Sequence, residues 1–94
     1  MNLEKSKKRI AKRVKMGFQG YPQISIVYLG LSQKSASEVV VEFIAEEASV
    51  AMEQRFESTV DAREDEVIQS ALVKMIERSE AKTVRSSAAV ELIS

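Results

Sequence analysis

Two neighbouring runs rich in β-branched and aromatic residues constrain the fold more than any other feature of this chain. Residues 23–29 (QISIVYL) and 37–45 (SEVVVEFIA) both alternate, so that the larger apolar side chains of each run share one face. These residue types favour strands, and the short polar connection at 30–35 favours an antiparallel hairpin. Residues 17–22, with two glycines and Pro22, predict a turn before the first strand.

The clearest helix is predicted over residues 62–79. Its apolar residues repeat at i, i+1, i+4 and i+5, which is the spacing of one continuous helical face. The members of this face are Val67, Ile68, Ala71, Leu72, Met75 and Ile76. Asp61 and Glu64 predict a capping box at the start of the helix. We expect the apolar face to pack on the sheet.

Three further segments complete the expected order. Residues 50–57 alternate as a half-buried strand does, although their Ala, Met, Glu and Gln content is also compatible with a helix. The side chains predicted to face the core are Val50, Met52 and Phe56. Residues 82–85 and 89–93 are each predicted to form a short strand. The fold class is therefore predicted to be α+β, with the order α-β-β-β-α-β, a mainly antiparallel sheet and the second helix packed on one face.

Composition excludes several classes of function. The 94 residues correspond to one domain, and 45% apolar with 30% charged residues is typical of a soluble globular protein. The chain has no Cys and no His, which removes disulfides, thiolate metal sites and the commonest general base. No apolar run is long enough for a transmembrane helix. We predict a cytoplasmic protein without cofactor or metal.

The charge is distributed very unevenly along the chain. Residues 1–15 carry seven basic residues and one acidic residue, a net charge of +6, whereas residues 16–94 carry seven basic and thirteen acidic residues, a net charge of −6. We expect residues 1–16 to form a basic N-terminal helix or arm, and residues 17–94 to form the α+β body. Such an asymmetry is typical of an arm that binds polyanions.

The basic segment has the spacing of a phosphate-binding face. Lys5, Lys8, Lys12 and Lys15 are separated by three, four and three residues, so they share one side of a helix. Arg9 and Arg13 flank them, and Phe18 and Tyr21 follow, either to stack on bases or to anchor the turn on the sheet. The predicted nucleic-acid-binding residues are Lys5, Lys8, Arg9, Lys12, Arg13, Lys15, Phe18 and Tyr21. Because that helix carries no Asn or Gln, we expect little sequence preference.

A second hypothesis is a protein-interaction or homo-oligomerisation module that does not bind nucleic acid. In this interpretation the basic helix pairs with the acidic surface of its own or a neighbouring subunit, or open sheet edges pair to form a homodimer. Catalysis is not predicted, since no serine has a His base. The acidic group near residue 61 has the chemistry to hold Mg²⁺, but acids are also expected in a first helical turn; its members are Asp61, Glu64, Asp65 and Glu66.

Residues 14–22 (VKMGFQGYP) resemble a bacterial protein family that shares a basic start and a K-x-G-F-x-G-Y-P motif and has no assigned activity. The resemblance continues through Tyr28-x-Gly30, Ala36-Ser37-x-Val39, Arg55-Phe56 and Asp61-Ala62-Arg63-x-Asp65. It implies a folded domain of bacterial origin. Many members carry a Cys- and His-containing tail that resembles a metal site. These 94 residues contain neither residue type, so that chemistry is not implied for them.

Overall fold

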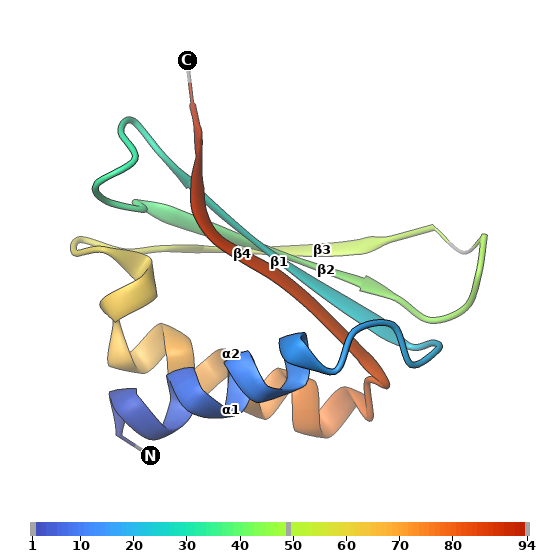
Figure 1. Ribbon diagram of the computed structural model, residues 1–94. Coiled ribbons are helices and arrows are strands. Elements are labelled where there is room, and N and C mark those ends of the chain that lie inside the picture. Colours follow the sequence, from blue (N-terminus) through green and yellow to red (C-terminus); the bar gives the residue numbers. More distant parts are fainter. Residues whose placement is uncertain (1, 49, 94) are drawn as a thin grey trace.

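A computed structural model describes residues 2–48 and 50–93 of the chain. The elements are α1 (Leu3–Lys15), β1 (Gln23–Gly30), β2 (Glu38–Ile44), β3 (Met52–Glu57), the 3-10 turn η1 (Ala62–Glu64), α2 (Glu66–Ser79) and β4 (Thr83–Leu92) (Figure 1). The predicted α+β class and its α-β-β-β-α-β order are confirmed. Neither helix in the described part of the chain is long and apolar enough to cross a membrane.

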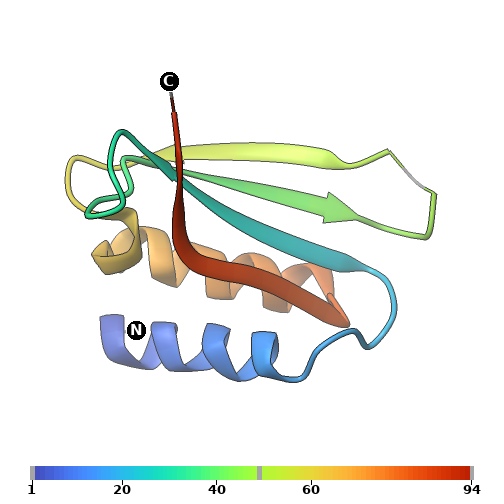
Figure 2. The same cartoon turned by 45° about the horizontal axis from the view of Figure 1, so that its top comes forward.

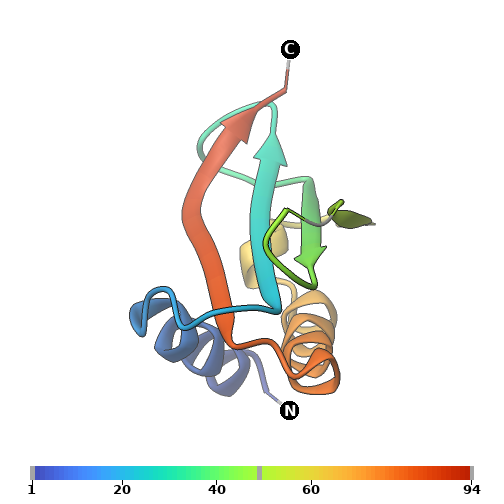
Figure 3. The ribbon, with the colours of Figure 1, turned by 90° about the vertical axis from the view of Figure 1, so that its right-hand side faces the viewer.

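The four strands form one sheet in the order β3-β2-β1-β4. The predicted hairpin pairs β1 with β2 antiparallel, from Gln23 opposite Ile44 to Leu29 opposite Glu38, and β3 continues antiparallel beside β2. Only β4 runs parallel to its neighbour, β1. Both helices lie on the same face of the sheet, α1 toward the β4 edge and α2 below β1 and β2 (Figures 2 and 3).

The core lies between the sheet and the two helices. The alternation predicted for residues 23–29 is confirmed, because Ile24, Ile26 and Tyr28 are all buried on the helix-facing side of β1. Packed with them are residues of β2, both helices and β4, namely Ile10, Val39, Val41, Ile68, Leu72, Val73, Ile76, Val84 and Val90. One apolar layer therefore joins all the elements except β3, which contributes only the partly buried Phe56.

The start of α2 differs from the predicted one. Residues 62–64 form η1, and Asp61 caps this turn by accepting a hydrogen bond from the Arg63 amide at 3.1 Å. Asp65 is the true N-cap of α2, since its Oδ1 accepts from the amides of Val67 and Ile68 at 3.0 and 3.2 Å. The capping box of Asp61 with Glu64 was therefore a wrong prediction. Asp65 satisfies the free amides of the first helical turn instead.

The apolar face of α2 is also rotated relative to the prediction. Val67 is 79% exposed, whereas Val73, which was not assigned to the face, is 3% exposed. The buried side chains Ile68, Leu72 and Ile76 define a stripe on which Val73 lies and Val67 does not. Because α2 packs against both the sheet and α1, Val73 is covered from the side of α1, which periodicity alone does not reveal.

The strand predicted over residues 50–57 is confirmed for Met52–Glu57. Its predicted burial is mostly wrong, since Val50 is 90% exposed and lies outside the strand, and Met52 is 71% exposed. Only Phe56 is partly buried. The alternation correctly separates the two faces of β3, but β3 is an edge strand beyond the reach of α2, so its helix-side face is left largely uncovered (Figure 3).

The C-terminal segment forms one strand, β4, where two were predicted. Ser86 pairs with Ile26, but Val90 pairs with Tyr28, so extra residues of β4 are accommodated in a bulge between these pairs. The β-branched residues on either side of the bulge remain in register with β1. The two predicted strands at 82–85 and 89–93 are therefore the two halves of a single irregular edge strand.

Candidate nucleic-acid interface

A narrow apolar stripe docks α1 on the body. Ile10 and Ser6 are buried, and Val14 is partly buried against the core. The Ser6 hydroxyl lies 3.3 Å from the Ser70 hydroxyl of α2. Asn2 caps the helix by accepting from the Lys5 amide at 2.9 Å. The sequence required Ile10 and Val14 to dock if the helix was to be stable, and both do.

Three of the seven cations of α1 attach it to the rest of the protein. Lys7 pairs with Glu64 of η1 at 2.6 Å, and Arg9 pairs with Glu77 of α2 at 3.1 Å. The Arg13 guanidinium donates to the main-chain carbonyl of Ala81, just after α2. Arg9 and Arg13, predicted as phosphate contacts, are thus placed on the α2-facing side of the helix. The acidic body of the chain neutralises part of the basic helix.

The remaining four cations form the outer face of α1, which we define as Lys5, Lys8, Lys12 and Lys15. All four are exposed, and among residues 2–48 and 50–93 none of them has a carboxylate within ion-pair distance. They lie on the side of the helix opposite Ile10, as the spacing predicted. Ten residues of helix rise by about 15 Å, so the outer face is a continuous basic strip of about that length.

An aromatic pair follows α1 directly. The rings of Phe18 and Tyr21 meet edge to face, with 5.4 Å between their centroids and an angle of 74° between their planes. Phe18 is 53% exposed, whereas Tyr21 is partly buried. The turn is tied to β4 by the Thr83 hydroxyl, which accepts from the Gln19 amide at 2.8 Å and donates to the Gly20 carbonyl at 2.7 Å. Phe18 is therefore the ring that offers a free surface.

Arg85 of β4 joins this turn and was missed by the sequence analysis. Its guanidinium carbon lies 5.9 Å from the centroid of the Phe18 ring, within the range of a cation–π contact. The Arg85 Nε also donates to the Gln23 side chain at 3.2 Å. Only the parallel pairing of β4 with β1 brings this residue to the turn, so no local pattern in the sequence indicates it.

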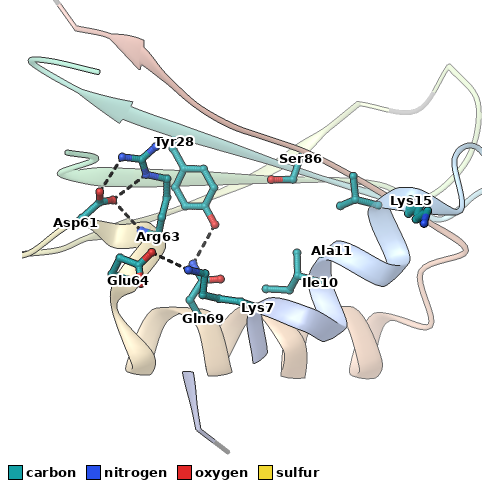
Figure 4. Close-up of a pocket in the computed structure, with 11 residues that line it drawn as sticks. Lys7, Ile10, Ala11, Lys15, Tyr28, Asp61, Arg63, Glu64, Gln69 and Ser86 are labelled. Carbon is teal, nitrogen blue, oxygen red and sulfur yellow. Dashed lines mark hydrogen bonds and ion pairs between the residues drawn. The ribbon is translucent and has the colours of Figure 1, made fainter. Parts of the chain in front are cut away.

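A groove of about 620 Å³ lies between α1, η1 and the sheet (Figure 4). Ile10, Ala11 and Val14 form its apolar wall on α1. The polar groups at its other end are bonded to one another. Besides the pair of Lys7 and Glu64, these are an ion pair of Arg63 with Asp61 at 2.7 Å and a hydrogen bond from the Gln69 amide to the Tyr28 hydroxyl at 2.9 Å.

Hydrogen bonds hold Asp61 and Lys7 of the groove in their charged forms. The hydrogen bond from Arg63 lowers the pKa of Asp61 to about 2, and the bond to Glu64 raises the pKa of Lys7. Burial raises the pKa of the Tyr28 hydroxyl, which keeps this group neutral. The groove is best described as a network that fastens α1 and η1 to the sheet.

Three of the four acidic residues considered as magnesium ligands, Asp61, Glu64 and Asp65, are bonded to the protein itself. Besides its cap bonds, Asp65 accepts from the Ser58 hydroxyl at 2.8 Å, and Glu64 is paired with Lys7. Both carboxylate oxygens of Asp61 accept hydrogen bonds from the Arg63 guanidinium, at 3.0 and 2.7 Å. In the described ranges of the chain no three carboxylates converge in a way that would hold a metal ion.

Comparisons with known proteins give no relative from which a function could be transferred. No protein-family model, no curated protein and no solved structure matches this chain. A functional proposal therefore depends on the outer face of α1, its neighbouring turn and the charge of the surrounding surface.

Proposed function

We propose that this protein binds the phosphate backbone of nucleic acids through the outer face of α1. The observation that carries this proposal is the division of the cations of α1 into two groups. Three are bonded to the body, whereas Lys5, Lys8, Lys12 and Lys15 are exposed without an acidic partner among the described residues. A solvated strip of four lysines on a docked helix is a suitable surface for neutralising phosphates.

The acidic surface of the body favours this orientation. The face of the sheet that carries no helix presents four carboxylates, those of Glu38 and Glu42 of β2 and Glu53 and Glu57 of β3, against the single cation Arg55 on these two strands. These carboxylates repel a polyanion from the β3 side, whereas α1 lies toward the opposite, β4 edge (Figure 3). A nucleic acid would accordingly approach the protein from the α1 side.

The proposed binding mode has little base specificity. Backbone phosphate contacts carry no direct sequence information, and Asn2, the one amide side chain at the start of α1, is occupied as the N-cap. Phe18, with Arg85 against its ring, is a suitable platform for an unstacked base. We therefore expect single strands to gain a stacking contribution that a duplex does not.

The salt dependence of binding tests the mechanism. Four lysine–phosphate contacts predict a slope of log K against log salt of about −3.6 on duplex DNA and about −2.8 on single strands. Fluorescent RNA and DNA oligomers, single-stranded and duplex, are titrated by anisotropy from about 50 to 200 mM salt, where this term is large. Absence of binding at the lowest salt would overturn the proposal.

A matched pair of charge variants separates a local interface from a general charge effect. The first replaces Lys5, Lys8 and Lys12 by Glu, and the second replaces Lys34, Lys74 and Arg78, which are also exposed, by Glu. Both change the net charge equally. We expect the first to lose binding at physiological salt and the second to bind nearly as wild type does. An equal loss in the two variants would contradict an interface on α1.

A further inference from the structure

The two edges of the sheet differ in how well they resist pairing with another strand. β4 is interrupted by its bulge, and bulges are a common protection of exposed edges. β3 pairs regularly with β2 over its whole length, from Met52 opposite Phe43 to Glu57 opposite Glu38, and contains no Pro or Gly. In residues 2–48 and 50–93, no strand pairs with its outer side. β3 is therefore a regular and unprotected edge.

The main-chain groups that β3 offers to a neighbour follow from its ladder with β2. The Ser58 amide donates to the Ser37 carbonyl at 2.9 Å, which makes this a hydrogen-bonded pair of the antiparallel ladder. Hydrogen-bonded pairs alternate along such a ladder, so the main chains of Met52, Gln54 and Phe56 bond to β2. The amides and carbonyls of Glu53, Arg55 and Glu57 therefore point outward.

We infer that β3 pairs antiparallel with the β3 strand of a second copy of this chain, about a two-fold axis at Gln54. This register places Glu53 opposite Arg55 of the second copy, and Arg55 opposite Glu53 of the second copy. These are the residues whose main-chain groups point outward, so the opposed pairs exchange hydrogen bonds while their side chains form ion pairs. The strand is complementary to itself in both charge and hydrogen bonding, as a two-fold interface requires.

Other registers fit less well. An axis at Arg55 opposes Glu53 to Glu57 and Arg55 to itself, which sets like charges against each other. An axis at Phe56 opposes Arg55 to Glu57, but only residues 55–57 of the strand then overlap, whereas the axis at Gln54 overlaps residues 52–56. The Arg55 guanidinium is available for a new partner, because it is exposed and its distances to Glu38 and Glu53 are 3.7 and 3.8 Å.

The same register covers apolar surface on the helix side of the sheet. A groove of about 490 Å³ opens there beside α2, with Phe43, Met52 and Met75 in its lining. Pairing about Gln54 sets Met52, which is 71% exposed, opposite Phe56 of the second copy. Each groove is thereby extended by an apolar residue of the other copy. The occupant with complementary charge, hydrogen bonding and apolar contacts is thus the protein itself.

Sedimentation over a concentration series tests the interface directly. Wild type is expected to form a dimer, and E53R and R55E are each expected to weaken it at least about tenfold, because each turns both ion pairs into like-charge pairs. An equal mixture of E53R and R55E restores opposite charges at every position. We expect this mixture to form a heterodimer at concentrations where each variant alone is monomeric.

The charge variant E57R is the matched control on the same strand. With the axis at Gln54, Glu57 lies opposite residue 51, so E57R should dimerise as wild type does. An E57R variant that dissociates would overturn this register in favour of the axis at Phe56.

Two results would overturn the β3 interface as a whole. One is wild type that stays monomeric up to about 1 mM, the weak end of the affinity range, and the other is a dimer that E53R and R55E do not affect. Nucleic-acid binding is measured in a separate experiment from dimerisation, because α1 lies away from β3.

Discussion

The guanidinium of Arg63 contacts the carboxylate of Asp61 at 2.7 Å, and only Ala62 lies between the two residues in the chain. Arg63 also reaches the carbonyl of Lys34 at 3.3 Å, and Asp61 accepts from the Ala36 amide at 3.3 Å. The pair therefore fastens η1 to the connection between β1 and β2. It sets the position from which α2 begins.

Replacing Asp61 by Asn tests the strength of this connection and its pH dependence. The pKa of Asp61 is lowered from 3.8 to about 2, so the carboxylate stabilises the fold fully above about pH 4, and this contribution is lost as the pH falls toward 2. Allowing for solvent screening, we expect Asp61→Asn to lower the free energy of unfolding at pH 7 by about 1–2 kcal/mol. The variant should also lose less stability than wild type between pH 4 and 2.

Urea unfolding at pH 7, 4 and 2.5 measures both effects. The control is Glu46→Gln, which removes an exposed carboxylate that has no hydrogen-bond or ion-pair partner among the described residues, and it should match wild type at pH 7. An acid-induced loss of stability that is as steep in Asp61→Asn as in wild type would show that Asp61 is not its source.

The start of α2 shows why part of the fold could not be predicted from the sequence. Asp61 and Asp65 are both good N-caps in local terms, and the pattern of apolar residues after them is the same for either choice. The choice is made by a distant contact, because the Ala62 amide donates to the carbonyl of Ala36 at 2.7 Å and closes η1 against the hairpin. By contrast, the faces of β1 were predictable, since buried and half-buried residues alternate along the whole of this strand.

The candidate interface on α1 was likewise predictable only in part. Helical geometry alone predicts that the four lysines of the outer face of α1 lie on one side of the helix. That Lys7 and Arg9 are bonded to the body depends on Glu64 and Glu77, which are 57 and 68 residues away in the chain. The basic helix follows from the sequence, whereas the division of its cations into bonded and exposed groups follows only from the tertiary structure.

Gln69 is the buried polar side chain whose loss should be most damaging. Its amide donates to the Tyr28 hydroxyl at 2.9 Å and to the Ala62 carbonyl at 3.0 Å. Gln69→Leu leaves both acceptors without this donor, so we expect a loss of about 2–3 kcal/mol in the free energy of unfolding. Tyr28→Phe removes one acceptor and leaves the bond to Ala62, so its cost should be about 1 kcal/mol.

A double-mutant cycle in urea checks this assignment. Because the two side chains share a hydrogen bond, the double variant should cost less than the sum of the single variants. Additive effects would mean that the bond between Gln69 and Tyr28 does not contribute to stability. Equal costs for the two single variants would contradict the role of the Ala62 carbonyl.

A glycine is required at position 30 because there is no room for a side chain, and not because of its backbone conformation. A Cβ atom at this position would lie 2.3 Å from the main-chain oxygen of Ser35 and 3.1 Å from Cγ1 of Val90. Since the backbone of the connection after β1 would have to move, we expect Gly30→Ala to destabilise the protein by about 1–3 kcal/mol. Thermal unfolding is the measurement, and Ser37→Ala, at an exposed position of the same hairpin, should leave the midpoint nearly unchanged.

Phe18 is where the proposed function makes its most specific prediction. Its ring is half exposed, with Arg85 over it and Tyr21 in edge-to-face contact with it, so a stacked base would add to the phosphate contacts of α1. A stacked base contributes about 1–3 kcal/mol, so Phe18→Ala should weaken binding of single strands about 5- to 150-fold. Duplex binding, which uses the lysines alone, should change little.

The matched control is Leu31→Ala, which removes an exposed apolar side chain from the connection after β1. It should bind single strands and duplexes as wild type does. If Phe18→Ala weakens both substrates equally, the ring acts by positioning the end of α1, and stacking is excluded. If it weakens neither while the variant with Lys5, Lys8 and Lys12 replaced by Glu fails to bind, recognition is confined to phosphates, because the lysines alone then account for the affinity.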